Sequence, residues 1–328
     1  MTATANILLQ GTVVLPGYLV ERLIRQPDAR YTTAWFDTLP ALVDAWCKRW
    51  HITLDSKLPK QSYNIVIFGH SAKMGPVVLK LTAPDDEFAA EVAGLKATQG
   101  QHMVRLLYSD LASAGMLLER VLPGTALRDQ ENRTDNEGTR IAAESLLSIW
   151  TAPPASPGDL IPLERWFRNL FRYEEQLRNG RADRPLPQDV TIKAVAVARL
   201  LLATDDPVVL HGDLHHDNIL INRSGGWTII DPKGLIGDRS YDVGTWMLNP
   251  PPASETAECA ILLARRTGIF ADVLGIDRSR IIAGALVHSA LAASWAVVDA
   301  TPDDYAEDTW LANSIEATKV FARMYEQA

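Results

Sequence analysis

The stretch HGDLHHDNIL at residues 211–220 constrains this chain more than any other feature. Its polar residues recur at defined distances: Asn218 lies five residues after Asp213, and a further acid, Asp231, lies 13 residues after Asn218. The pair Gly225–Gly226 between them indicates a tight hairpin. The sequence therefore predicts a polar loop and a second acid on either side of a short hairpin.

The three histidines of this stretch could instead form a metal site. His211 and His215 would offer ligands at i and i+4 if they lay on a helix. Gly212 and the strand-like VVL at 208–210 favour a loop, and neither cysteine nor glutamate nearby completes a zinc set. We expect His211 and His215 to brace the loop through backbone hydrogen bonds and His216 to be a solvated turn residue. A zinc-dependent hydrolase is the less favoured alternative.

The spacing of the acids and the amide is that of kinase-like enzymes, which transfer phosphoryl groups. A base must orient the acceptor hydroxyl and take its proton, and Asp213 suits that role. The triphosphate needs a metal ion to neutralise it, and hard oxygen ligands such as Asn218 and Asp231 suit Mg²⁺. The constellation therefore predicts ATP and Mg²⁺ as cofactors.

The same plan requires a lysine on a strand and a glutamate on the following helix. Lys80 lies in the strand-like VVLKL, and Glu91 lies in the helical segment after it. Their ion pair would hold the lysine against the α- and β-phosphates. All five residues occur in the order that the plan requires. A non-catalytic nucleotide-binding protein on the same fold is an alternative, which the intact set disfavours.

The first part of the chain is rich in strands. Hydrophobic spacing and β-branched residues predict a helix at 39–50, strands at 62–72 and 75–83, a helix beginning at Pro84, and two strands within 102–121. Pro84 suits the first helical position, and the acids that follow it suit the positive end of the helix dipole. Residues 1–40 either cover the sheet or mediate association.

The rest of the chain is mainly helical, with predicted helices at 137–151, 162–178 and 188–204. The apolar segment 281–298 is only 18 residues long, near the lower limit for a membrane span, and it contains His288 and two serines. We expect a buried core helix there. The fold class is therefore α+β with two lobes: a small antiparallel-sheet lobe at 1–121 and a larger, mainly helical lobe at 122–328.

Composition narrows the function classes. The net charge of −8 argues against nucleic acid as a main partner, because such proteins carry basic patches. From Asp242 to Ala328 the chain has 12 acids and 6 bases, which suits a cationic small molecule. Cys47 and Cys259 form no CxxC pair, which indicates a reducing compartment. We expect a cytoplasmic protein with no signal peptide and no membrane segment.

The stretches LHGDLHHDNIL and WTIIDPKGLIGDRSYDVG resemble the aminoglycoside phosphotransferase superfamily. More narrowly, they resemble its branch of streptomycin 6-phosphotransferases and hydroxyurea phosphotransferases, of which IDPKGL-GD is characteristic. The resemblance runs from about Leu79 to about Val298 and is most specific at 209–238. It implies a protein-kinase-like two-lobe fold and an ATP-dependent phosphotransferase that inactivates an antibiotic.

The resemblance also implies residue roles. Asp213 matches the catalytic base, Asn218 and Asp231 match the metal ligands, and Lys80 and Glu91 match the phosphate-binding pair. Residues Glu119 to Val121 match the segment whose backbone meets the adenine ring. Before Lys80 there is no GxGxxG, and the phosphate-covering turn would be LPKQSY (58–63), with Ser62 a candidate backbone donor. Gly212 replaces the arginine of protein kinases, which disfavours that class.

The acceptor-binding residues match the family poorly. Streptomycin-like acceptors carry guanidinium groups, which pair with carboxylates. The acidic segment DATPDDYAED (299–308) offers Asp299 and Asp304, and Trp246 or Trp295 could add an apolar or cation–π wall. Asp242 is either a brace of the catalytic loop or a charge at a helix start. A housekeeping kinase for a sugar, choline-like or amino-alcohol acceptor is the alternative, and the oligomeric state is open.

Overall fold

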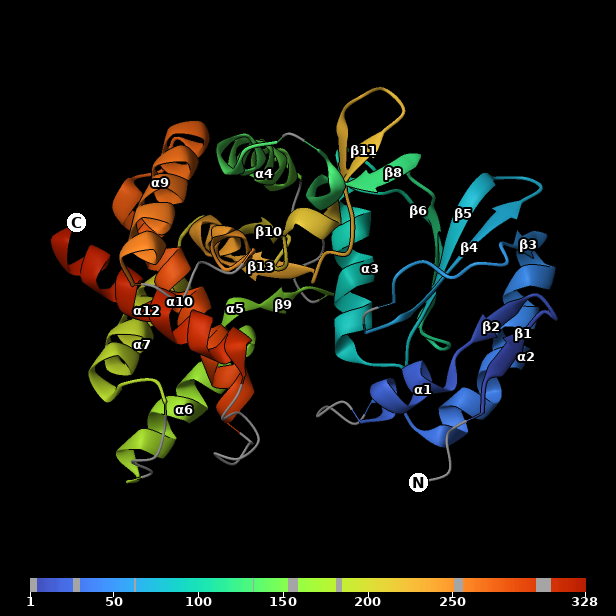
Figure 1. Cartoon of the computed structure of the whole chain (residues 1–328), viewed down its shortest axis with the longest axis horizontal. Helices are drawn as coiled ribbons and strands as arrows, with labels where there is room; N and C mark the ends of the chain where they lie inside the picture. Colours follow the sequence, from blue (N-terminus) through green and yellow to red (C-terminus); the bar gives the residue numbers. More distant parts are fainter. Residues whose placement is uncertain are drawn as a thin grey trace.

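Figure 1 shows the computed structural model of the chain, in which a small lobe and a larger lobe lie side by side. The structure describes residues 5–25, 30–61, 63–131, 133–152, 159–180, 185–250, 256–298 and 308–328. The small lobe holds the largest sheet, and the larger lobe holds most of the helices. The predicted α+β fold with two lobes is confirmed.

The small lobe is built on a five-stranded antiparallel sheet with the strand order β3-β4-β5-β7-β6. The strands are β3 (Ile52–Leu54), β4 (Ile65–Ser71), β5 (Gly75–Leu81), β6 (Leu106–Asp110) and β7 (Gly115–Glu119). Helix α3 (Asp86–Thr98) follows β5 and lies between the sheet and the larger lobe (Figure 1). The predicted strands around 62–83 and within 102–121 are thus confirmed.

The hairpin of β4 and β5 sets the direction of Lys80. Successive side chains of a strand point to opposite faces of the sheet, so Leu79 and Leu81 share one face and Lys80 takes the other. Leu79 and Leu81 are buried in the apolar cluster of the small lobe. Lys80, which pairs with Val66 across the hairpin, therefore faces α3 and the cleft.

The N-terminal segment covers the other face of this sheet. It forms β1 (Ile7–Leu9), β2 (Val13–Leu15), α1 (Gly17–Ile24) and α2 (Thr33–Trp50). One buried cluster joins this segment to the sheet, and it includes Leu9, Leu15, Leu23, Phe36, Leu39, Val43, Trp46, Ile65, Ile67, Val77, Leu79, Leu81 and Leu117. The described part of residues 1–40 thus has the first of its two expected roles, covering the sheet.

Two helix starts differ from the sequence-based expectation. Helix α2 begins at Thr33 rather than near residue 39, because the Thr32 hydroxyl accepts from the Trp35 amide 3.2 Å away and caps the helix. The expected start of α3 at Pro84 is wrong. Asp85 is the N-cap, its carboxylate accepts from the Phe88 amide at 2.7 Å, and the helix begins at Asp86.

The larger lobe carries two three-stranded sheets, with the orders β10-β13-β9 and β12-β11-β8. Their strands are β8 (Pro123–Ala126), β9 (Ile161–Pro162), β10 (Val208–Leu210), β11 (Ile219–Asn222), β12 (Trp227–Ile229) and β13 (Leu235–Gly237). The chain leaves the five-stranded sheet at Glu119 and enters the second of these sheets at Pro123. The predicted division after residue 121 falls within this crossing.

The helices of the larger lobe surround α10 (Arg278–Val297). The others are α4 (Asp135–Trp150), α5 (Leu163–Trp166), α6 (Arg168–Arg178), α7 (Gln188–Leu202), α8 (Gly244–Met247), α9 (Thr256–Leu274) and α12 (Thr309–Gln327). Short 3-10 helices are η1 (Leu127–Asp129), η3 (His216–Asn218) and η4 (Arg239–Val243). The predicted helix at 162–178 is divided into α5 and α6 at Phe167.

Helix α10 is a core helix, as its sequence predicted. Among the described residues it is the one helix long and apolar enough to cross a membrane by length and composition, and 83% of that stretch is buried. His288 lies in its middle, 4% exposed, where Nδ1 is 3.2 Å from the Tyr241 hydroxyl and Nε2 is 3.4 Å from the Thr245 hydroxyl. Burial lowers the pKa of His288 to about 3.

We expect His288 to make the protein less stable in mild acid. An unfolded histidine binds a proton below about pH 6.5, whereas buried His288 stays neutral to about pH 3. Acid therefore favours the unfolded chain, and the stability is fully present above pH 6.5. Between pH 6.5 and 5 this residue contributes a loss of up to about 2 kcal/mol. Urea unfolding of the native protein and His288→Gln at several pH values checks this. Equal pH dependence in both proteins would contradict it.

Candidate active site

The loop between β10 and η3 carries the first predicted acid, Asp213. Gly212 before it has a φ of +78°, in the left-handed region that glycine tolerates. A Cβ at this position would lie 2.7 Å from the Leu235 side chain, so close packing against β13 also requires glycine. Asp213 keeps 31% of its side chain exposed. The local sequence therefore places a carboxylate at the surface of a tightly packed loop.

Asp242, in η4, holds this loop through hydrogen bonds to its backbone. Its Oδ1 accepts from the Gly212 amide at 2.7 Å, and its Oδ2 accepts from the His211 amide at 2.9 Å. Oδ2 also accepts from Nε1 of Trp150 at 3.1 Å. Burial raises the pKa of Asp242 to about 6, although these three donors act in the opposite direction. Of its two expected roles, these contacts show the brace, because Asp242 holds the loop that carries Asp213.

The histidines of the loop have different environments. His211 accepts from the Asp213 amide at Nδ1, 3.1 Å away, so Nε2 carries the proton and donates to the Ile230 carbonyl at 2.9 Å. His215 accepts from the Asp217 amide at 3.2 Å. Both histidines thus brace the loop, as expected. Among the described residues there is no cluster of three or more histidines, cysteines and acids that could hold a metal ion.

The expectation that His216 is solvated is wrong. Its ring stacks on the indole of Trp246 with centroids 3.8 Å apart, and burial lowers its pKa to about 4. Trp246 is fully buried and donates from Nε1 to the Thr139 hydroxyl at 3.1 Å. A fully buried indole cannot form the wall of an open pocket, so the predicted acceptor-binding role of Trp246 is wrong, and its indole packs instead against the loop that carries Asp213.

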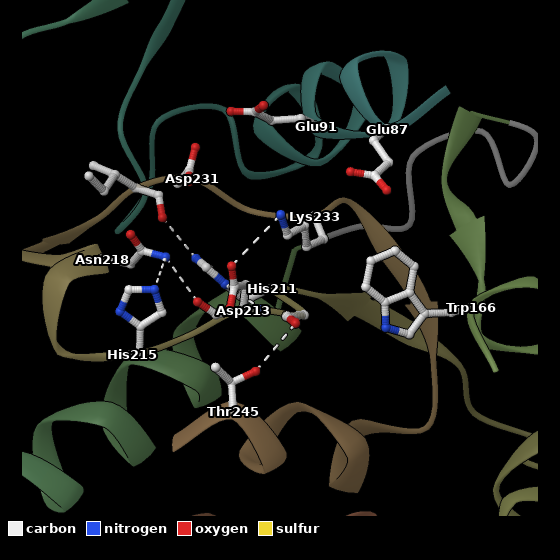
Figure 2. A network of polar contacts seen from close by, with 12 residues as sticks. Glu87, Glu91, Trp166, His211, Asp213, His215, Asn218, Asp231, Lys233 and Thr245 are labelled. Carbon is white, nitrogen blue, oxygen red and sulfur yellow. Dashed lines mark hydrogen bonds and ion pairs between the residues drawn. The ribbon is translucent and has the colours of Figure 1, made fainter. Parts of the chain in front are cut away.

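Asn218 and Asp231 lie on the same side of Asp213 (Figure 2). Asn218 donates from Nδ2 to the Asp213 carbonyl at 2.9 Å, which leaves its Oδ1 oriented as an acceptor. Asp231 binds the Lys80 ammonium through Oδ1. Burial by itself raises the pKa of Asp231, but the ammonium groups of Lys80 and Lys233 hold it well below the usual range. The site therefore presents an amide oxygen and an ionised carboxylate.

The lysine and the glutamate of the small lobe form the predicted pair. Lys80 Nζ lies 2.6 Å and 2.8 Å from the two carboxylate oxygens of Glu91, and both residues are buried. Burial lowers the pKa of Lys80, but the carboxylates of Asp231 and Glu91 raise it more, so the lysine is charged. One ammonium therefore links the sheet, α3 and the segment between β12 and β13 that carries Asp231.

Lys80, Glu91 and Asp231 line a cavity of about 190 Å³ between the lobes. Its lining comprises Arg30, Tyr63, Asn64, Lys80, Thr82, Asp85, Glu87, Phe88, Glu91, Asp231, Pro232 and Lys233. The sequence predicted three of them. Arg30 comes from the N-terminal segment and pairs with Asp85 at 2.8 Å. Sequence gave no signal for Arg30, whereas Lys233 lies in the IDPKGL-GD stretch, where no role was assigned to it.

Asp213 has a cationic neighbour that the sequence reasoning missed. Lys233 Nζ lies 3.8 Å from Asp213 Oδ2, and Figure 2 shows the ammonium directed toward this carboxylate. Burial raises the pKa of Asp213, and the charge of Lys233 partly offsets this. The carboxylate is thus a better proton acceptor than an exposed aspartate, and it stays close to a compensating charge.

A second cavity, of about 530 Å³, lies near the predicted adenine-binding segment. It is lined by Asp55, Ser56, Lys57, Leu58, Pro59, Phe68 and Arg120. Arg120 follows Glu119, pairs with Asp55 at 2.6 Å and lies 4.0 Å from the ring centroid of Phe68. The Glu119 side chain accepts from the Arg105 amide at 3.0 Å, and the Glu119 amide donates to the Arg105 carbonyl at 3.0 Å. Ser62 lies outside the described residues.

The remaining acceptor-binding predictions fall on α10 and beyond. Trp295 is 41% exposed, and its ring meets Trp166 edge to face with centroids 5.5 Å apart. Figure 2 shows Trp166 on the side of Lys233 opposite Asn218. Asp299 and Asp304 lie outside the described residues.

A two-lobe fold that brings a buried lysine–glutamate pair against an aspartate-bearing loop defines the class of kinase-like phosphotransferases. Within this class the chain belongs to the aminoglycoside/hydroxyurea antibiotic resistance kinases, whose family model matches residues 49–300. The protein is therefore an enzyme that transfers a phosphoryl group from ATP to a small-molecule acceptor.

The sequences and structures of individual proteins are similar to this chain. A streptomycin 6-kinase of Streptomyces glaucescens is 31% identical over 284 residues, which cover 81% of this chain and 85% of that protein. A streptomycin 3''-kinase of Klebsiella pneumoniae is 30% identical over 77% of this chain and 91% of its own. A choline kinase structure from Streptococcus pneumoniae superposes with a TM-score of 0.56 over 88% of this chain and 99% of its own. At 13% identity that likeness shows the fold alone.

Proposed function

We propose that this enzyme moves the γ-phosphoryl group of ATP to a hydroxyl group of streptomycin or a closely related aminoglycoside, and so inactivates it. The similarity to two streptomycin kinases over most of the chain carries this proposal. Those relatives are named for different hydroxyl positions, so the position phosphorylated is a separate question. We assign the reaction to the cytoplasm, where ATP is available.

The residues of the cleft support a direct transfer. Asp213 would accept the proton of the acceptor hydroxyl as its oxygen attacks phosphorus, and ADP would leave on the opposite side. Lys80, held by Glu91, would bind the α- and β-phosphates. The backbone from Glu119 to Val121 would meet the adenine, and the turn containing Ser62 would cover the phosphates. Most of the rate enhancement would come from positioning and charge neutralisation.

The donor set near Asp213 fits a magnesium ion. The Oδ1 of Asn218 and the ionised carboxylate of Asp231 are hard oxygen ligands, and Mg²⁺ is commonly held by one or two such groups together with substrate phosphates and water. Such an ion would neutralise the charge on the phosphates. We expect excess EDTA to remove the activity and Mg²⁺, but not Zn²⁺, to restore it. Full activity of the metal-stripped enzyme in EDTA would contradict this assignment.

We propose that the acceptor lies on the Trp166 side of the cleft and is cationic. Trp295 offers an exposed aromatic surface there, and the acidic segment with Asp299 and Asp304 follows α10 in sequence. Trp295→Ala should raise the KM of the acceptor several-fold and leave the KM of ATP unchanged, because a cation–π contact contributes about 1 kcal/mol. Tyr18→Ala, an exposed aromatic residue on α1, is the control. Unchanged acceptor KM would exclude Trp295 from the site.

Acceptor phosphorylation tests the proposed function itself. Purified enzyme is mixed with γ-labelled ATP and streptomycin, and hydroxyurea is tested in parallel. Mass spectrometry and phosphorus–proton NMR locate the new phosphate. Phosphorylated streptomycin is the expected product. Transfer to hydroxyurea alone, or to choline but to neither antibiotic, would overturn the assignment of the acceptor.

A further inference from the structure

Lys233 is fixed above the catalytic loop by its backbone. It follows Asp231 and Pro232 directly, and its amide donates to the His211 carbonyl at 2.7 Å. A Cβ built on Gly212 would lie 3.1 Å from the Cβ of Lys233, so the two segments are in close contact. The stem of the lysine therefore starts from a fixed point beside Asp213.

The ammonium of Lys233 lies among three acids. It is 3.8 Å from Asp213, and it lines the same cavity as Asp231 and Glu87. An ammonium surrounded by carboxylates keeps its charge. Lys233 therefore places a positive group on the wall of the cavity next to Asp213.

The two lysines of the cavity have different surroundings. Lys80 is bound at hydrogen-bond distance by both oxygens of Glu91 and by Asp231, and 5% of its side chain is exposed. Lys233 keeps 30% of its side chain exposed, and its 3.8 Å separation from Asp213 is an electrostatic contact beyond hydrogen-bond length. Lys80 is thus a fixed anchor, whereas Lys233 can turn its N–H groups toward a group that enters the cavity.

We propose that Lys233 is a further catalytic residue, which contacts the γ-phosphoryl group and stabilises its charge during transfer; this rests on the proposed kinase function. In that step the acceptor oxygen forms a bond to the γ-phosphorus, and its proton passes to Asp213. The bond from phosphorus to the β–γ bridging oxygen breaks, and ADP leaves with the electron pair. Lys233 keeps its proton and donates hydrogen bonds to the transferred group.

The position of Lys233 suits this role better than that of a simple counterion. The transferred group must pass next to the base. Of the two lysines that line the cavity, Lys233 is the one whose ammonium lies within 4 Å of Asp213. In phosphoryl transfer the charge spreads over the equatorial oxygens, so a cation beside the acceptor stabilises the transition state more than the bound ground state. Loss of such a donor lowers kcat by about 10²- to 10³-fold in comparable sites.

Nucleotide binding in the absence of acceptor tests the proposal. Calorimetry with MgATP and MgADP compares the native enzyme with Lys233→Met and Lys80→Met. We expect Lys233→Met to weaken ATP binding at least about tenfold more than ADP binding, because only ATP has the γ-phosphate. Lys80→Met should weaken the binding of ATP and of ADP by the same factor, since Lys80 would contact the α- and β-phosphates, which both nucleotides have. Equal losses for ATP and ADP in Lys233→Met would reduce Lys233 to a structural counterion.

Steady-state kinetics supply the second readout, with the acceptor that the enzyme is found to phosphorylate as the substrate. Lys233→Met should lower kcat by about 10²-fold or more and leave the acceptor KM nearly unchanged, and Lys233→Arg should recover part of kcat because it restores the charge. A kcat of Lys233→Met within threefold of the native value would overturn the proposal. Lys233→Gln and melting temperatures guard against misfolding. Because nucleotide binding needs no acceptor, a wrong acceptor assignment leaves the calorimetric result intact.

Discussion

Asp213→Ala lowers kcat by about 10²- to 10⁴-fold, while ATP binds nearly as tightly as to the native enzyme. The carboxylate lies on a loop that Asp242 and His211 hold in place, beside the charge of Lys233. In the proposed mechanism, its removal takes away the group that orients the acceptor hydroxyl and accepts its proton. Lys80 and Asp231, which line the cavity between the lobes and which we propose bind the nucleotide and its metal ion, are untouched. Single-turnover kinetics and ATP calorimetry measure the two effects separately.

A neighbouring acid of the same loop is the control for this prediction. Asp217 pairs with Arg128 at 2.8 Å at the surface, and both side chains are at least one third exposed. Exposed ion pairs contribute little, so Asp217→Ala should keep kcat within a few-fold of the native value. If Asp213→Ala retained native turnover with its acceptor, another group would have to be the base. If both variants lost activity equally, the effect would come from loop distortion.

Asp242→Asn lowers the stability of the larger lobe by about 3 kcal/mol or more and reduces kcat as well. Both carboxylate oxygens of Asp242 accept N–H donors, from Gly212 on one side and from His211 and Trp150 on the other. An amide has only one acceptor oxygen, so its NH₂ would face a buried N–H donor. Each buried donor left without a partner costs about 1–3 kcal/mol. The loop that carries Asp213 would then lose its fixed position.

Urea unfolding and the temperature dependence of kcat check this second prediction. Asp272, on the exposed side of α9, supplies the control, because Asp272→Asn should change the stability by less than about 0.5 kcal/mol. A native-like unfolding midpoint for Asp242→Asn would mean that the three hydrogen bonds contribute little. If Asp242→Asn lost stability but kept the native kcat, Asp242 would stabilise the fold without supporting catalysis.

Much of the fold could be predicted because it follows from local patterns. The strand pair around 62–83 alternates with period two, and the apolar repeat of 188–204 has helical spacing. The structure places these elements within a residue or a few of the predicted positions, as β4, β5 and α7. Helix starts were predicted less well, because a cap depends on one side-chain hydrogen bond, as at Thr32 and Asp85.

The candidate site divides in the same way. The order and spacing of Lys80, Glu91, Asp213, Asn218 and Asp231 follow from the sequence. Three of them line the cavity between the lobes, and Figure 2 shows Asp213 and Asn218 near Asp231. Their individual roles stay predictions. The prediction that Trp246 lines the acceptor pocket was wrong, because the residue type and its place in the sequence do not say on which side of the loop the indole packs. The stacked His216 and the Thr139 hydroxyl determine that.

By itself the sequence determined the class of chemistry and the two-lobe plan, because the side chains that bind phosphate and metal are limited in kind and their spacing reflects loops and strands. Only the tertiary structure decided which further groups meet there. Lys233 reaches Asp213 because its amide is bonded to His211, and Arg30 reaches the cavity because the N-terminal segment packs on the sheet. Such contacts join residues far apart in the chain, so their distance is set by the packing of whole elements and not by any local pattern.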